Sequence, residues 1–179
     1  MKRGLAVLAF GLIALGVQGG IAMAIPRVLC PDLGLLVVIA IGLHWRGNTG
    51  GLLLASALGF AADVLSSSIF GAHALLRVLV YATTALTRSQ LDLRSGAALA
   101  LFAGAMTVFY AGGLVVLMRF FGGAGEGLQW SGIGALFPHI AVNAIMAPFV
   151  SALLVRLCDW AEGEANRPGL EIDAKRTVT

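Results

Sequence analysis

The residues with the strongest chemical potential are polar side chains inside long apolar segments. Asp63 is the only carboxylate deep within such a segment, and His73 and Arg77 follow in the next one. A charge at the centre of a membrane helix costs about 2.5–3.5 kcal/mol, so it normally faces the protein interior and has a partner. Asp63 lies eight residues before Gly71 and Arg77 six residues after it, so a helical hairpin turning there places both at similar depth. We expect Asp63 and Arg77 to form a structural ion pair, with His73 as the next candidate partner. The alternatives are a proton or ion relay and the wall of a ligand cavity.

Small residues recur at four-residue spacing in the segment that carries Asp63. Gly51, Ala55 and Gly59 occupy successive turns of one helix face. A stripe of small side chains lets the backbone of a second helix approach closely. We therefore expect these three positions to form a helix-packing surface.

The last apolar segment places His139 and Asn143 one helical turn apart. A His/Asn pair in a membrane helix is more often an interhelical hydrogen-bonding site than a metal or catalytic site. Ser66 to Ser68 lie near His73, but serines at a hairpin commonly satisfy backbone groups. Signatures of zinc hydrolases, dithiol redox proteins and phosphate-binding loops are absent from the sequence. We expect no enzymatic activity, no catalytic residue, no metal and no cofactor.

The composition indicates an all-α integral membrane protein. The 179 residues are 59% hydrophobic and 12% charged, with a mean hydropathy of +0.92, whereas soluble domains carry about 25% charged residues. This excludes a soluble enzyme, a disordered chain and a disulfide-stapled secreted domain. The apolar runs are too long, and alternate too little, for barrel strands of about ten residues. Basic residues flank the apolar runs, so we expect no nucleic-acid partner.

The apolar runs predict six transmembrane helices in one domain, residues 1–160. The tail 161–179 is charged, and we expect it to be disordered. The expected spans are about 4–25, 28–45, 51–68, 72–90, 97–121 and 133–157.

The distribution of basic residues predicts the orientation of these spans. Six spans place both termini on one side, and the segments on that side carry nine of the 12 Lys and Arg residues. Only Arg27, Arg77 and Arg119 remain for the other side. Cytoplasmic segments are enriched in basic residues. We therefore expect a multi-pass protein of the cytoplasmic (inner) membrane with both termini in the cytoplasm.

Three motifs, in this order and spacing, resemble the bacterial rod-shape-determining protein MreD family. They are Pro31-Asp32-Leu33 at the opening of a span, Gly59-Phe60-Ala61-Ala62-Asp63-Val64-Leu65-Ser66, and Phe70-Gly71-Ala72-His73-Ala74-Leu75. The resemblance covers roughly residues 31–90. It departs from the family pattern at Phe70, where leucine is frequent, and at Ile69, where proline is common.

The resemblance implies a function that the residues alone do not define. MreD-like proteins are non-enzymatic scaffold subunits of the elongation machinery (the elongasome) that carries out peptidoglycan synthesis and sets cell shape. They bind the single-span protein MreC and work alongside a transpeptidase and a glycosyltransferase. Their fold resembles the six-helix substrate-binding subunit of energy-coupling-factor vitamin transporters, and that transporter role is the alternative function. We also expect contacts with membrane lipids and allow for a homo-oligomer.

Overall fold

The computed structural model describes residues 2–45, 47–66, 70–90, 93, 95–121 and 131–165. Over these residues the protein is all-helical, as its composition predicts, with six α-helices, one 3-10 turn and no strand. The elements are α1 (Lys2–Ala24), η1 (Arg27–Leu29), α2 (Leu33–His44), α3 (Asn48–Ser66), α4 (Ala72–Thr87), α5 (Gly96–Phe121) and α6 (Ser131–Ala165).

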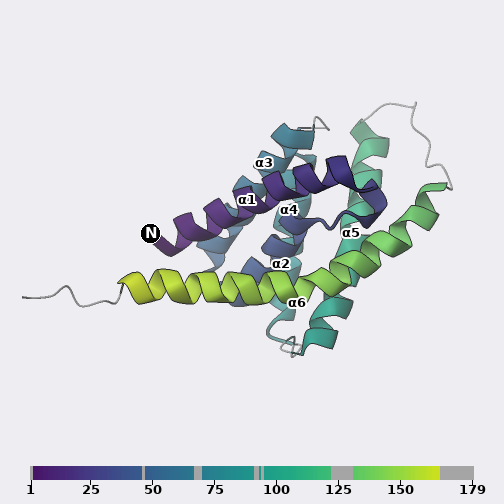
Figure 1. The fold of residues 1–179 in the computed structure, drawn as a ribbon. Helices are drawn as coiled ribbons and strands as arrows, with labels where there is room; N and C mark the ends of the chain where they lie inside the picture. The colour runs from purple at the N-terminus through teal and green to yellow at the C-terminus, as the bar shows by residue number, and fades with distance from the viewer. Residues whose placement is uncertain are drawn as a thin grey trace, which may run out of the picture.

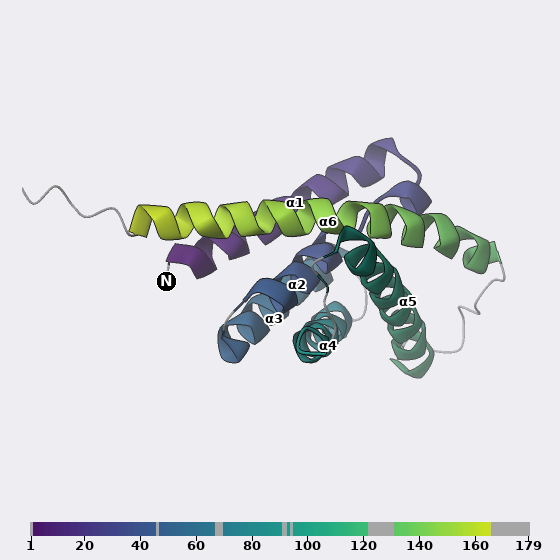
Figure 2. The same cartoon turned by 90° about the horizontal axis from the view of Figure 1, so that it is seen from below.

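The helices are arranged around α2. The long helices α1 and α6 lie side by side and run across the group formed by α3, α4 and α5 (Figure 1). Seen from below, α6 extends across the molecule, α3 and α4 lie on the far side of α2, and α5 runs outward from its contact with α6 (Figure 2). Among the described elements, α2 contacts all five other helices. It is therefore the centre of the fold.

The central helix α2 is short and apolar all round. Of its 12 residues, the nine from Gly34 to Gly42 are all buried. A helix that is hydrophobic on every side is one that is enclosed by protein or lipid. It begins at Leu33, later than the span predicted from residue 28, because Pro31 disfavours helical backbone in the residue before it and the Asp32 side chain caps the first turn.

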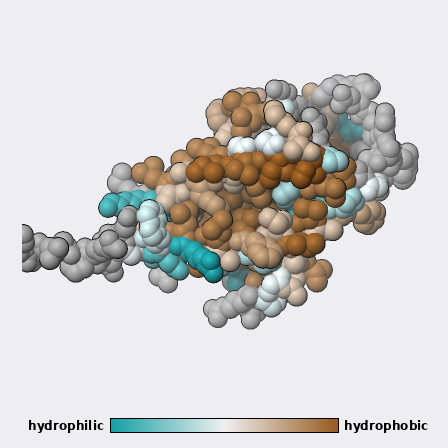
Figure 3. Space-filling view, in the orientation of Figure 1, coloured by the Kyte–Doolittle hydropathy of each residue, from teal (hydrophilic) through white to brown (hydrophobic). Residues whose placement is uncertain are grey.

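Four of the described helices are long and apolar enough to cross a membrane. These are α1, α3, α5 and the part of α6 from Leu136 to Gly163, whereas α2 and α4 have only 12 and 16 residues. The described helices α2 and α4 are apolar but shorter than the spans expected from the sequence. Much of the face seen in Figure 3 is hydrophobic, and hydrophilic residues gather on it near the start of α1 and the end of α6.

Helix α6 extends further than the sequence analysis predicts. It continues to Ala165, so residues 161–165 of the expected disordered tail are helical, and residues 166–179 lie outside the described part of the chain. Glu162 on this last stretch forms an ion pair with Arg3 of α1. Arg3 also donates to the carbonyl of His44 at 3.3 Å and lies 4.9 Å from the centre of the Trp45 ring. The start of α1 and the end of α6 therefore lie at the same end of the molecule.

Helices α3 and α4 pack so closely that one position between them admits only glycine. A Cβ atom on Gly59 would lie 2.4 Å from the Cα of Ala74. One turn and two turns earlier, Ala55 and Gly51 are also buried, and a Cβ on Gly51 would meet the Tyr81 ring. The predicted stripe of small residues thus faces the interior of the hairpin rather than the exterior of the molecule.

Candidate functional site

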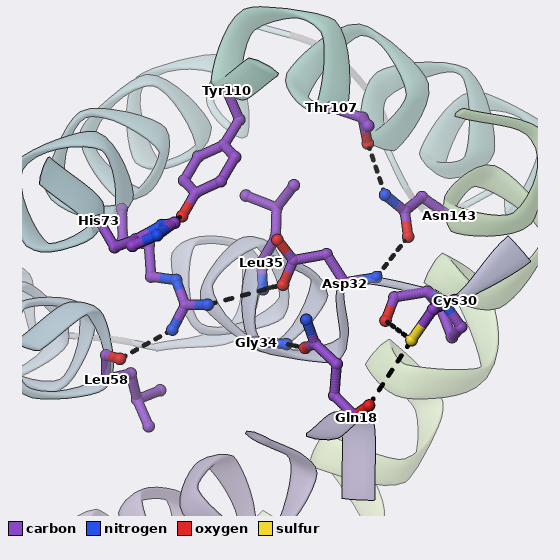
Figure 4. A network of polar contacts seen from close by, with 12 residues as sticks. Gln18, Cys30, Asp32, Gly34, Leu35, Leu58, His73, Thr107, Tyr110 and Asn143 are labelled. Atoms are coloured by element: carbon purple, nitrogen blue, oxygen red, sulfur yellow. Dashed lines mark hydrogen bonds and ion pairs between the residues drawn. The ribbon is translucent and has the colours of Figure 1, made fainter. Parts of the chain in front are cut away.

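Asp32 and Arg77 form a buried ion pair beside the start of α2. Arg77 Nη2 lies 3.5 Å from Asp32 Oδ1, and their side chains are only 2% and 14% exposed. Asp32 Oδ1 also accepts the backbone N–H of Leu35 at 2.9 Å, which caps α2. Arg77 Nη1 donates to the carbonyl of Leu58 in α3 at 2.7 Å. The guanidinium of Arg77 on α4 therefore joins α2 to α3 (Figure 4).

The sequence prediction that Arg77 pairs with Asp63 is wrong. Asp63 accepts the backbone N–H of His73 at 2.8 Å and that of Ala74 at 3.0 Å. The first N–H groups of a helix need acceptors from outside the helix. Gly71, the N-cap residue of α4, has no side chain to supply one. Asp63 therefore caps α4 across the hairpin, and the ionic partner of Arg77 within the described chain is Asp32.

His73 contributes to the site through its ring as well as its backbone. Its Nδ1 is hydrogen-bonded to the hydroxyl of Tyr110 on α5, and the two rings stack with centroids 5.9 Å apart. The ring of His73 therefore links α4 to α5.

Asn143 connects α6 to α2 and α5. It is fully buried, with 0% exposed surface. Its Oδ1 accepts the backbone N–H of Asp32 at 2.8 Å, and its Nδ2 donates to Thr107 Oγ1 at 3.1 Å. The same Nδ2 lies 3.3 Å from His139 Nε2, one turn earlier in α6. Asn143 thus belongs to the same polar network as Asp32 (Figure 4), and His139 joins this network through Asn143.

Helix α1 reaches the network through Gln18. Its Oε1 accepts the backbone N–H of Gly34 at 3.2 Å, and its carbonyl accepts a contact from Cys30 Sγ at 3.6 Å. Every helix around α2 therefore contributes a polar group near the start of α2.

The sequence analysis missed several members of this network. Asp32 follows Pro31 and precedes an apolar run, which is a recognisable helix-cap signal. Gln18, Thr107 and Tyr110 are polar groups within apolar segments, and such groups normally face the protein interior. The same rule that selected Asp63 would have selected these three residues. Ser67 and Ser68, which we expect to satisfy backbone groups at the hairpin, lie outside the described residues.

A cavity of about 320 Å³ adjoins the ion pair. We call it the polar cavity; its polar lining residues are Gln18, Asp32, Ser66, His73, Arg77, Tyr110 and His139. Two of these lining residues, Arg77 and His139, each have a buried nitrogen atom (Nε and Nδ1) without a hydrogen-bond partner among the described residues. Among the described residues, no group of three or more His, Cys, Asp or Glu side chains could hold a metal ion. The arrangement is suited to binding a ligand through hydrogen bonds.

A second hollow, which we call the apolar groove, lies between α1, α2 and α6 and measures about 290 Å³. It is lined by Phe10, Ile13, Ala14, Val17, Leu33, Val37, Met146, Phe149, Val150 and Leu153. All these side chains are hydrophobic. The groove therefore differs in chemistry from the polar cavity.

Comparison with known proteins identifies the family. A family model described as rod shape-determining protein MreD matches residues 2–157. No curated protein and no solved structure matches the chain. The match extends from the first turn of α1 to the last third of α6 and so includes all of α1 to α5 and most of α6. The chain therefore belongs to the MreD family of rod shape-determining proteins.

Proposed function

We propose that this protein is a non-enzymatic scaffold of the rod-shape machinery and holds the transmembrane helix of an MreC-like single-span protein. The observation that carries this proposal is the family match over residues 2–157. Participation in peptidoglycan synthesis, with an elongation transpeptidase and glycosyltransferase as further partners, belongs to the same proposal. The alternative role as a vitamin-transporter subunit has no comparable support, and the resemblance to the fold of that subunit remains a prediction.

The apolar groove is the surface that best suits a partner helix. In lipid, helices associate through close packing rather than through the hydrophobic effect. A hollow between α1 and α6 gives a partner side chain more contacts than a convex helix surface gives. Ile13 and Phe149 line the groove and are themselves exposed, so their side chains are available to such a partner.

Filling the apolar groove should weaken partner binding. Leu153 lines the groove and is 53% exposed, so Leu153→Trp adds bulk there without entering the core. We expect recovery of a co-expressed, tagged MreC-like protein to fall about tenfold, which corresponds to about 1.4 kcal/mol. The matched control is Leu101→Trp on α5, where the leucine is 78% exposed and outside the groove.

Two results would contradict this assignment. Equal recovery of the MreC-like protein by both variants, each with the elution volume of the parent, would exclude the groove as the docking surface. Capture of a coupling ATPase pair in place of the MreC-like protein would overturn the scaffold function itself.

The proposed orientation places both termini in the cytoplasm and the α3–α4 turn on the opposite side. Single cysteines introduced by Phe70→Cys and Ser95→Cys test this, because both positions are exposed and lie at opposite ends of α4 and its flanking turns. The background should carry Cys30→Ala and Cys158→Ala, which remove the two native thiols. We expect a membrane-impermeant maleimide added to intact cells to label only the Phe70→Cys protein. Labelling of only the Ser95→Cys protein would reverse the orientation.

A further inference from the structure

One N–H group of Arg77, a lining residue of the polar cavity, is buried without a hydrogen-bond partner among the described residues. A guanidinium has five N–H donors. Nη1 donates to the Leu58 carbonyl and Nη2 lies 3.5 Å from Asp32, whereas Nε is buried without a partner. A buried donor that is left unpaired destabilises the folded protein. His139 Nδ1, also in the lining of the polar cavity, is buried without a partner too. An occupant of the cavity that supplies hydrogen-bond acceptors would satisfy these groups.

The charges around the polar cavity favour an uncharged occupant. The lining contains one carboxylate, Asp32, and one guanidinium, Arg77, and these two are paired with each other. Asp63 does not line the cavity, and both its oxygens accept backbone N–H groups. A ligand with net charge would therefore enter a low-dielectric site without a counter-ion.

Hydroxyl groups match this combination of donors and acceptors. A hydroxyl can donate to the Asp32 carboxylate and also accept from the Arg77 guanidinium. A hydroxyl group can make both hydrogen bonds while Asp32 and Arg77 stay paired. A zwitterionic ligand would have to separate Asp32 from Arg77 in order to pair with both of them. The volume of about 320 Å³ is at the lower end of the ~300–1,000 Å³ found for ligand pockets. The cavity therefore suits a small ligand or a head group.

One wall of the polar cavity is apolar and reaches the outside of the molecule. Gly19 and Ala22 of α1 and Leu65 of α3 line this wall, and Leu65 is 67% exposed. An acyl chain could follow this wall while its head group occupies the polar side. We propose that the polar cavity binds an uncharged polyhydroxyl group, either a free sugar or the sugar head group of a lipid.

Gly19 offers a way to block the polar cavity without disturbing the fold. It lines the cavity, and a Cβ atom built on it meets nothing within 4 Å. Gly19→Leu therefore places a side chain in open space at the cavity wall. Gly20→Leu is the matched control, because Gly20 is equally unobstructed but does not line the cavity. Tyr110→Phe removes the Tyr110 hydroxyl from the cavity lining and keeps the shape of the aromatic ring.

The test uses native mass spectrometry of the purified full-length protein in micelles of tetraethylene glycol monooctyl ether. Three dioleoyl lipids serve as probes, namely monoglucosyl-dioleoylglycerol, phosphatidylcholine and phosphatidylglycerol, and free glucose is the fourth. We expect the glucolipid to bind the parent and Gly20→Leu about tenfold more tightly than it binds Gly19→Leu. Tyr110→Phe should lose about fivefold in affinity, as expected for one hydrogen bond. Phosphatidylcholine and phosphatidylglycerol should bind the parent protein no more tightly than they bind Gly19→Leu.

The possible outcomes distinguish a soluble sugar, an anionic ligand and binding outside the polar cavity. Binding of free glucose that Gly19→Leu abolishes supports the polyhydroxyl chemistry and identifies a soluble ligand as its source. Tighter binding of phosphatidylglycerol than of the glucolipid would overturn the inference in favour of an anion site. Equal glucolipid binding by Gly19→Leu and Gly20→Leu would show that the lipid adheres elsewhere and that the cavity holds water only.

Discussion

Replacing Arg77 with methionine should lower the free energy of unfolding by about 3–5 kcal/mol, the cost of leaving one charge of a buried pair without its partner. Asp32 would keep its place at the start of α2 but lose the guanidinium 3.5 Å away. Combining Arg77→Met with Asp32→Asn should recover part of the loss, because asparagine still caps a helix and carries no charge. Unfolding in mixed micelles of dodecyl sulfate and dodecyl maltoside provides the measurement.

The informative quantity in this experiment is the coupling between two substitutions. Residues that are in direct contact couple by about 0.5–3 kcal/mol. We expect coupling of this size between Asp32→Asn and Arg77→Met. The control cycle combines Asp63→Asn with Arg77→Met and should show the smaller coupling, since Asp63 binds backbone N–H groups of α4 instead. A larger coupling in the control cycle would restore the pair predicted from the sequence.

Gly59→Ala should also destabilise the protein severely, although it adds a single methyl group. That methyl would lie 2.4 Å from the Cα of Ala74 and 3.0 Å from the carbonyl oxygen of His73. Both are backbone atoms, so α3 and α4 must separate. Overpacking of a core costs about 1–3 kcal/mol and occasionally more. The destabilisation by Gly59→Ala should lie at or above the upper end of this range, because the separation also weakens the hydrogen bonds that backbone N–H groups of α4 donate to Asp63. Thermal unfolding followed by size-exclusion chromatography measures the effect.

Gly112→Ala is the matched control for this substitution. Gly112 lies in the middle of α5, and a Cβ atom built on it meets nothing within 4 Å. Alanine is a better helix former than glycine by about 1 kcal/mol. The control should therefore be as stable as the parent or more stable. Equal loss of folded protein in the two variants would show that α3 and α4 are not in close contact at Gly59.

Features that depend on neighbouring residues could be predicted from the sequence. The α3–α4 hairpin turns at Gly71, and the small residues of α3 face α4, because the relevant signals lie within one hairpin. The ion pair could not be predicted in the same way. Asp32 and Arg77 come from helices that are not adjacent in the chain, and their contact depends on where α2 enters the bundle. Counting residues from Gly71 places Arg77 at the same depth as Asp63. It does not show that the first backbone N–H groups of α4 need the Asp63 carboxylate as an acceptor.

The length of α2 could not be predicted from hydropathy either. Residues 28–30 are apolar and extend the run that α2 occupies, yet the helix starts only after the Pro31-Asp32 pair. Hydropathy measures the preference of a segment for a nonpolar environment. It does not distinguish a lipid-facing span from a helix enclosed by other helices, and α2 is of the second kind.

The enclosure of α2 has a consequence for the biogenesis of the protein. Twelve residues span only about 18 Å, well short of the ~30 Å hydrocarbon layer. The segment therefore cannot settle as an independent transmembrane unit when it leaves the ribosome. Its surroundings include α6, which is synthesised after the other described helices, so α2 reaches its final environment only after translation of α6 is complete. A chain that ends before α6 leaves one side of α2 uncovered and is a natural substrate for membrane quality-control proteases.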